Sequence, residues 1–89
     1  MTKQQATEYI EKLTQIGDEL LVYLDSDLYG DGTQIISYVV GCIRKEQDDL
    51  YYVNNDRPSQ RYVSKKIAIS RLMKISIERR FVVNQIQSK

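Results

Sequence analysis

Apolar residues recur every three or four positions over the first quarter of the chain. They are Ala6, Tyr9, Ile10, Leu13, Ile16, Leu20, Leu21 and Leu24. This spacing places them along one side of an α-helix, with charged residues on its other sides. Thr2 is suited to cap the start of that helix, and Gly17 marks a place where it can bend. The pattern predicts one long amphipathic helix from Lys3 to Leu24.

The middle of the chain has two segments of a different character. Residues 33–45 (TQIISYVVGCIRK) and 50–55 (LYYVNN) are rich in β-branched residues and tyrosine, and they flank the polar residues EQDD. This arrangement favours a β-hairpin. A helix over residues 34–48 is the alternative, because Ile36, Val39, Val40 and Ile43 also lie at helical spacing. Residues 55–60 (NDRPSQ) read as a loop around Pro58.

Residues 25–32 (DSDLYGDG) combine three aspartates with two glycines. A calcium loop starting at Asp25 would place Tyr29 at its fifth ligand position and Ile36 at the position of the bidentate glutamate, so that pattern fails. A phosphate loop would need a lysine that the segment lacks. Glycines that allow positive φ and aspartates that bind nearby amides are typical of a turn. The segment is therefore predicted to connect two elements.

Beyond Arg61, polar and apolar residues alternate. Apolar residues occupy most odd positions from 63 to 83, and serine, lysine and arginine occupy most even ones. Alternation of this kind predicts two half-buried strands, Arg61 to Ser70 and Lys74 to Asn84. The expected fold is a single α+β domain over residues 1–89. In it, one long N-terminal amphipathic helix packs on an antiparallel sheet of three or four strands.

An all-α alternative comes from residues 69–83 (ISRLMKISIERRFVV), which resemble a helix-turn-helix in outline. Ser70 would lie where the two helices cross, and Ile75 and Ser76 would form the turn. The resemblance implies that Arg79 and Arg80 lie on a recognition helix facing the major groove of DNA.

Charge is divided along the chain. Residues 1–50 hold four basic and ten acidic residues, a net charge of −6, and residues 51–89 hold nine basic and two acidic residues, a net charge of +7. Either the basic half binds nucleic acid or another polyanion, or the halves neutralise each other within the fold or between subunits. The candidate basic surface comprises Lys66, Arg71, Lys74, Arg79 and Arg80. Tyr51 and Tyr52 are candidate aromatic contacts, although packing within the hairpin is the simpler role.

The residue types restrict the chemistry. Without histidine, the chain has no Ser-His or Cys-His nucleophile pair and no histidine-ligated metal. Cys42 alone makes neither a disulfide nor a zinc site, and it is predicted to be a buried structural thiol. We therefore assign no catalytic residue, metal ligand or cofactor. The single cysteine, an N-terminus without a continuous apolar run, and the shortness of the apolar stretch from Ile35 to Ile43 favour a cytoplasmic protein outside the membrane.

Two functions fit these features. The first is a small non-enzymatic regulator, inhibitor or adaptor that binds an unknown protein partner, of the kind that phages and plasmids encode, and that also forms homo-oligomers. It rests on seven tyrosines, the lack of catalytic groups and the complementary halves. The alternative is a small nucleic-acid-binding regulator that uses the basic half.

Overall fold

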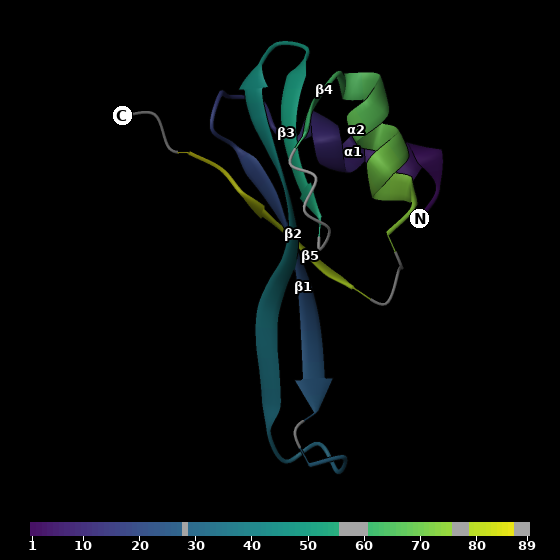
Figure 1. The fold of residues 1–89 in the computed structure, drawn as a ribbon, viewed down its shortest axis with the longest axis vertical. Helices are drawn as coiled ribbons and strands as arrows, with labels where there is room; N and C mark the ends of the chain where they lie inside the picture. Colours follow the sequence, from purple (N-terminus) through teal and green to yellow (C-terminus); the bar gives the residue numbers. More distant parts are fainter. Residues whose placement is uncertain (28, 56–60, 76–78, 87–89) are drawn as a thin grey trace.

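The computed structural model describes residues 1–27, 29–55, 61–75 and 79–86. Five antiparallel strands form one sheet in the order β4-β3-β2-β1-β5, and two helices cover one of its faces (Figure 1). The elements in chain order are α1 (Lys3–Glu11), β1 (Glu19–Asp27), β2 (Ile35–Gln47), β3 (Leu50–Asn55), β4 (Arg61–Val63), α2 (Lys65–Met73) and β5 (Arg80–Asn84). The α+β class is confirmed, but the sheet has five strands where three or four were predicted.

The N-terminal helix is much shorter than predicted. Thr2 caps it as expected, because its side chain accepts the Gln5 N–H while the Gln5 side chain accepts the Thr2 N–H. The helix ends at Glu11, and the chain turns before Gly17, whose φ is +97°. Residues from Glu19 onward are a strand, so the prediction of a helix up to Leu24 is wrong. Leucines at this spacing also suit a strand, in which Leu20 and Val22 point into the core.

The central hairpin is confirmed. β2 and β3 pair antiparallel on either side of Asp48 and Asp49. The segment DSDLYGDG is also the predicted connection: it begins as the end of β1 and turns toward β2, with positive φ at Gly30 and Gly32. Residues 56–60 of the predicted loop lie outside the described residues.

The prediction for the basic half is mostly wrong. Only Arg61–Val63 of the first expected strand forms a strand, and Lys65–Met73 is a helix. Ser64 caps this helix by accepting the Ile67 N–H, while Ala68 and Leu72, one turn apart, are fully buried. The second expected strand is confirmed over Arg80–Asn84; residues 76–78 lie outside the described residues.

The all-α alternative is also wrong. Arg80–Asn84 pairs with β1, so the described part of the helix-turn-helix outline contains α2 but a strand where the recognition helix was expected. Arg79 and Arg80 therefore do not lie on a helix.

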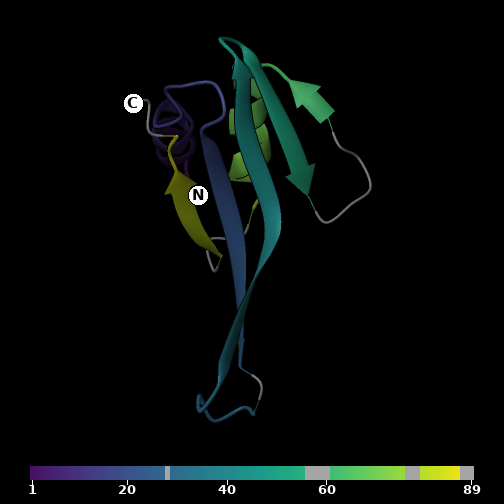
Figure 2. The same ribbon diagram turned by 90° about the vertical axis from the view of Figure 1, so that its left-hand side faces the viewer.

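The core lies between the helices and one face of the sheet. Figure 2 shows both helices behind the strands, on one side of the sheet. The cluster is built from Ala6, Ile10, Leu13, Leu20, Ile43, Tyr51, Val53, Ala68 and Leu72. Tyr9 on α1 also contacts Phe81 on β5, with 5.5 Å between ring centroids. The two helices thus hold the sheet from β5 to β3.

The strands β1 and β2 extend well beyond this core. β5 pairs with β1 only over Glu19–Tyr23, and β3 pairs with β2 only over Gly41–Gln47. Residues 24–27 and 29–40, which we call the arm, therefore form a two-stranded ribbon that projects from the sheet (Figure 1). A β-bulge marks its base, because Val22 pairs with Gly41 while Tyr23 pairs with Val39, which leaves Val40 without an opposite residue.

Candidate protein-binding arm

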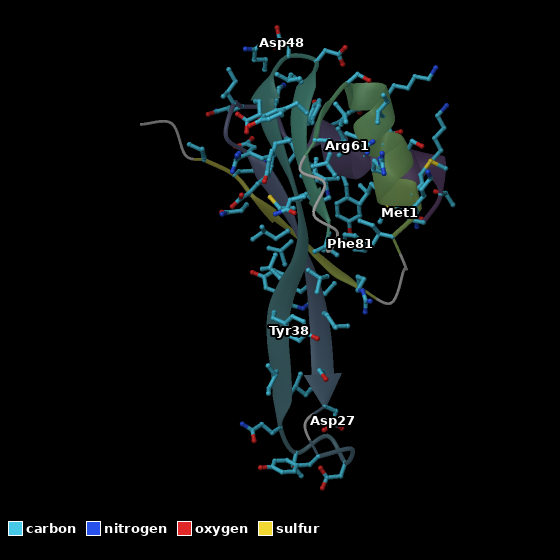
Figure 3. All side chains as sticks on the ribbon, viewed as in Figure 1. Met1, Asp27, Tyr38, Asp48, Arg61 and Phe81 are labelled. Atoms are coloured by element: carbon cyan, nitrogen blue, oxygen red, sulfur yellow. The ribbon has the colours of Figure 1, made fainter. Side chains whose placement is uncertain are left out.

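Apolar side chains on the arm are exposed. The exposed fractions are 63% for Ile35, 43% for Ile36, 46% for Tyr38 and 49% for Val39. These residues alternate between the two faces of the ribbon, and Figure 3 shows Tyr38 at mid-arm, far from the helices. A lone two-stranded ribbon is at best marginally stable in water, and large apolar side chains exposed together on one element indicate an interaction site. The arm is therefore the strongest candidate for a binding surface.

The two long edges of the arm differ in charge. The β1 edge carries Asp25 and Asp27, whereas β2 has no charged residue from Ile35 to Ile43. In the described part of the chain, no strand pairs with the outer edge of β2 between Ile35 and Val40. Its backbone amides and carbonyls are thus available to another strand.

The tip of the arm is held by one carboxylate. Asp27 accepts hydrogen bonds from the backbone N–H groups of Tyr29 (3.2 Å) and Gly30 (3.1 Å), and also from that of Gly32. Asp31 accepts from the N–H of Thr33 at 3.0 Å, and hydrogen bonds from Thr33 lower the pKa of Asp31. These contacts fix the connection between β1 and β2 at the far end of the ribbon, where Figure 3 labels Asp27.

The base of the arm is joined to β5 by Arg80. Its guanidinium Nε lies 3.2 Å from an Asp25 carboxylate oxygen, and its Cζ lies 4.5 Å from the centre of the Tyr23 ring. Ser37 on β2 donates to the same carboxylate at 2.6 Å. The hydrogen bond from Arg80, and next the one from Ser37, lower the pKa of Asp25, so it stays ionised in mild acid. β1, β2 and β5 are thus linked at the point where the arm leaves the body.

The sheet face opposite the helices carries aromatic and charged residues. Tyr52 and Tyr62 lie with ring centroids 5.4 Å apart, and Arg44 lies over the Tyr52 ring at 4.9 Å. Arg44 also binds Glu46 at 2.7 Å, so its charge is already paired. Tyr51 points to the other face and is buried in the core. Of the two candidate aromatic contacts, only Tyr52 is therefore placed on the open face.

Cys42 also lies on this open face. The Cys42 side chain was predicted to be buried, but it is only half-buried, and its Sγ lies 3.6 Å from Glu19 Oε2. Burial, and next the negative charge of Glu19, raise the pKa of Cys42 to about 11. Such a thiol is a poor nucleophile at neutral pH.

The five predicted basic residues are divided between two places. Lys66 and Arg71 are on α2, and Lys74 directly follows it. Arg79 and Arg80 instead line a groove of about 570 Å³ between α1 and the start of β5. The other residues lining the groove are Met1, Gln5, Glu8, Tyr9, Lys12 and Phe81. Arg79 and Arg80 are thus brought together in this groove, and Arg80 is paired with Asp25.

The arm residues were absent from the predicted site. The sequence did contain a signal, since residues 33–45 are apolar at both odd and even positions. A strand of that kind is usually buried on both faces, and here both faces are exposed beyond the bulge.

Other kinds of site are not evident in the described ranges. Within them, no three cysteine, aspartate or glutamate side chains are grouped as a metal site would require. Neither described helix has the length and apolar character to cross a membrane. Comparison with protein-family models, with curated proteins and with solved structures found no match.

Proposed function

We propose that the protein is a non-enzymatic binding module of the regulator, inhibitor or adaptor class that self-associates through its arm. The observation that carries the proposal is the exposure of Ile35, Ile36, Tyr38 and Val39 on a ribbon that no described helix covers. Burial of such side chains is the main favourable contribution in protein association.

The test is light scattering coupled to size-exclusion chromatography. We expect the wild-type protein to exceed the monomer mass at high concentration and Ile36→Lys to stay monomeric, because a lysine ammonium resists burial. Ile67→Lys on α2 is the matched control, since Ile67 is 46% exposed against 43% for Ile36. A strictly monomeric wild-type protein at high concentration would contradict the proposal.

Nucleic-acid binding is the second candidate, favoured by the contact of Arg44 with Tyr52 and by the cations of the groove. It is the weaker proposal because Arg44 and Arg80 already bind carboxylates. Mobility shift of labelled DNA and RNA at two ionic strengths tests it. Binding through phosphates must weaken as salt rises, and no retardation even at low salt excludes this function.

A further inference from the structure

Besides the acidic β1 edge of the arm, the described sheet offers three strand edges to a partner. The outer edge of β4 is three residues long and begins with Arg61. The outer edge of β5 runs from Arg80 to Asn84, beside α1 and its groove. The third is the arm edge of β2 from Ile35 to Val40, which is uncharged and lies on a ribbon without helices. The β2 edge is thus the longest and the least protected of the three.

Charge distinguishes a second copy of the chain from other occupants. In a two-fold pair, a strand edge meets the same edge of its copy, so like charges that lie close together on one edge are brought near each other. Pairing along the β1 edge would therefore bring Asp25 and Asp27 of both copies together. The β2 edge carries no charge, and its β-branched residues and tyrosine form favourable cross-strand pairs.

We propose that two copies of the chain pair antiparallel along Ile35–Val39 of β2, about a two-fold axis that passes through the sheet at Ser37. This inference rests on the proposed self-association and specifies its geometry. Opposite residues in an antiparallel pair must point to the same face, so the axis lies at a residue and not between two residues. Ile36 then faces Tyr38 of the partner subunit, and Ile35 faces the partner's Val39. The two ribbons become a four-stranded sheet.

The described strands leave the edge of β2 from Ile35 to Val39 open for this pairing. β3 occupies the row beside β2 only as far as Asn55, which is opposite Gly41, and the bulge at Val40 ends the regular part of the arm. Residues 35–39 therefore pair without displacing β3. The pairing also brings the acidic tip of one copy, with Asp31, toward the end of β3 and the start of β4 in the other, where Arg61 is exposed. The charges at the ends of the interface are complementary.

Disulfide cross-linking tests the position of the axis. In a Cys42→Ser background, Ser37→Cys would place two thiols directly opposite each other, within the reach of a disulfide. We expect a mild oxidant to convert most of this variant to a covalent dimer. Ser26→Cys, on the β1 side of the same ribbon and also exposed, is the matched control and is expected to form no covalent dimer under the same treatment.

A distance measurement tests the same geometry without altering the arm. Ser37 and Gln47 are ten residues apart on β2. At about 3.3 Å per residue, spin labels on Gln47→Cys in the two copies would lie about 65 Å apart. A separation below about 40 Å would mean that the bodies and not the arms meet, and it would overturn the pairing.

The outcomes separate this inference from the proposed function. A wild-type protein that stays monomeric contradicts both. If Ile36→Lys abolishes self-association but Ser37→Cys does not cross-link, the arm is the contact and the two-fold pairing is overturned. The same conclusion follows if the assembly that Ile36→Lys abolishes contains more than two copies.

Discussion

The carboxylate of Asp18 accepts a hydrogen bond from the backbone N–H of Ile86 at 2.7 Å, which joins the turn after α1 to the segment after β5. Its other oxygen accepts from the backbone N–H groups of Thr14 and Gln15, both at 3.0 Å. Asp18 is buried, so water does not replace these bonds when the side chain is removed. The side chain of Asp18 thus fixes the turn that separates the N-terminal helix from the sheet.

We expect Asp18→Asn to lower the thermal midpoint at neutral pH, because the amide cannot provide the two acceptor oxygens of the carboxylate. The hydrogen bonds from Gln15, first, and then from Ile86 lower the pKa of Asp18 below its ordinary value of 3.8. A lowered pKa in the folded state stabilises the fold above 3.8, and this contribution is lost as the pH falls through the folded value. The difference in midpoint between wild type and variant should therefore shrink in acid.

Thermal unfolding followed by circular dichroism over a series of pH values measures this. The comparison must be between the two proteins, because Asp25 and Asp31 also have lowered pKa values and contribute to the acid sensitivity of both. Asp48→Asn, at an exposed position in the β2–β3 turn, is the control for loss of one carboxylate. A constant difference across the acid range would show that the charge of Asp18 is unimportant.

Gly17→Ala should destabilise the protein more than Gly30→Ala. Both glycines have positive φ, 97° and 76°, a conformation that costs an L-residue about 1–2 kcal/mol. A Cβ on residue 17 would also overlap Ile86 Cδ1, whereas a Cβ on residue 30 would meet nothing. Urea unfolding of the two variants gives the comparison. Equal losses of unfolding free energy would mean that Ile86 moves aside at no cost.

Leu72→Ala should cost about 2–5 kcal/mol of unfolding free energy, since Leu72 is fully buried where α2 meets the rest of the core. The same truncation at Ile67, on the exposed side of α2, should change the stability by no more than about 0.5 kcal/mol. Denaturant titration of both variants measures this. Comparable losses at the two positions would contradict the placement of α2.

Cys42 should react slowly with thiol reagents in the folded protein. A pKa of about 11 instead of 9.0 reduces the thiolate fraction at pH 8 about 100-fold. We expect the alkylation rate to rise on unfolding, and to rise in folded Glu19→Gln because the nearby negative charge is removed. The rate of reaction with iodoacetamide as a function of pH checks both, and a rate equal to that of the unfolded chain would contradict them.

The sequence identifies features that depend on local chemistry. The β2–β3 hairpin follows from two β-prone segments around a polar turn, and the cap at Thr2 follows from the residue types that accept helix N–H groups. The turn containing Gly30 and Gly32 is of the same kind. None of these features requires knowledge of what packs against them.

The features that were missed depend on distant contacts. Leu20, Leu21 and Leu24 fit a helix and a strand equally, and the decision is made by Asp18, whose partner Ile86 is at the other end of the chain. In the basic half, the alternation suggested a strand, but Ala68 and Leu72 bury one side of a helix against the core. The helix-capping residue Ser64 was the local signal that could have shown this.

The arm shows the same limit for the candidate site. The run around Ile36 and Val39 is visibly apolar on both faces, but apolar residues are exposed or buried according to which elements cover them. Here α1 and α2 are too short and too close to the other end of the sheet to reach it. Exposure of this run is therefore a property of the tertiary structure.

β2 runs from Ile35 in the arm to Gln47 at the opposite end of the molecule, paired with β1 over most of that length. A pulling force applied to the arm along this strand acts parallel to the strands and loads many inter-strand hydrogen bonds at once. Shearing them together is harder than peeling them apart one by one, so the ribbon is mechanically suited to bear tension. A load on the arm would thus be passed directly into the part of the sheet beneath the helices.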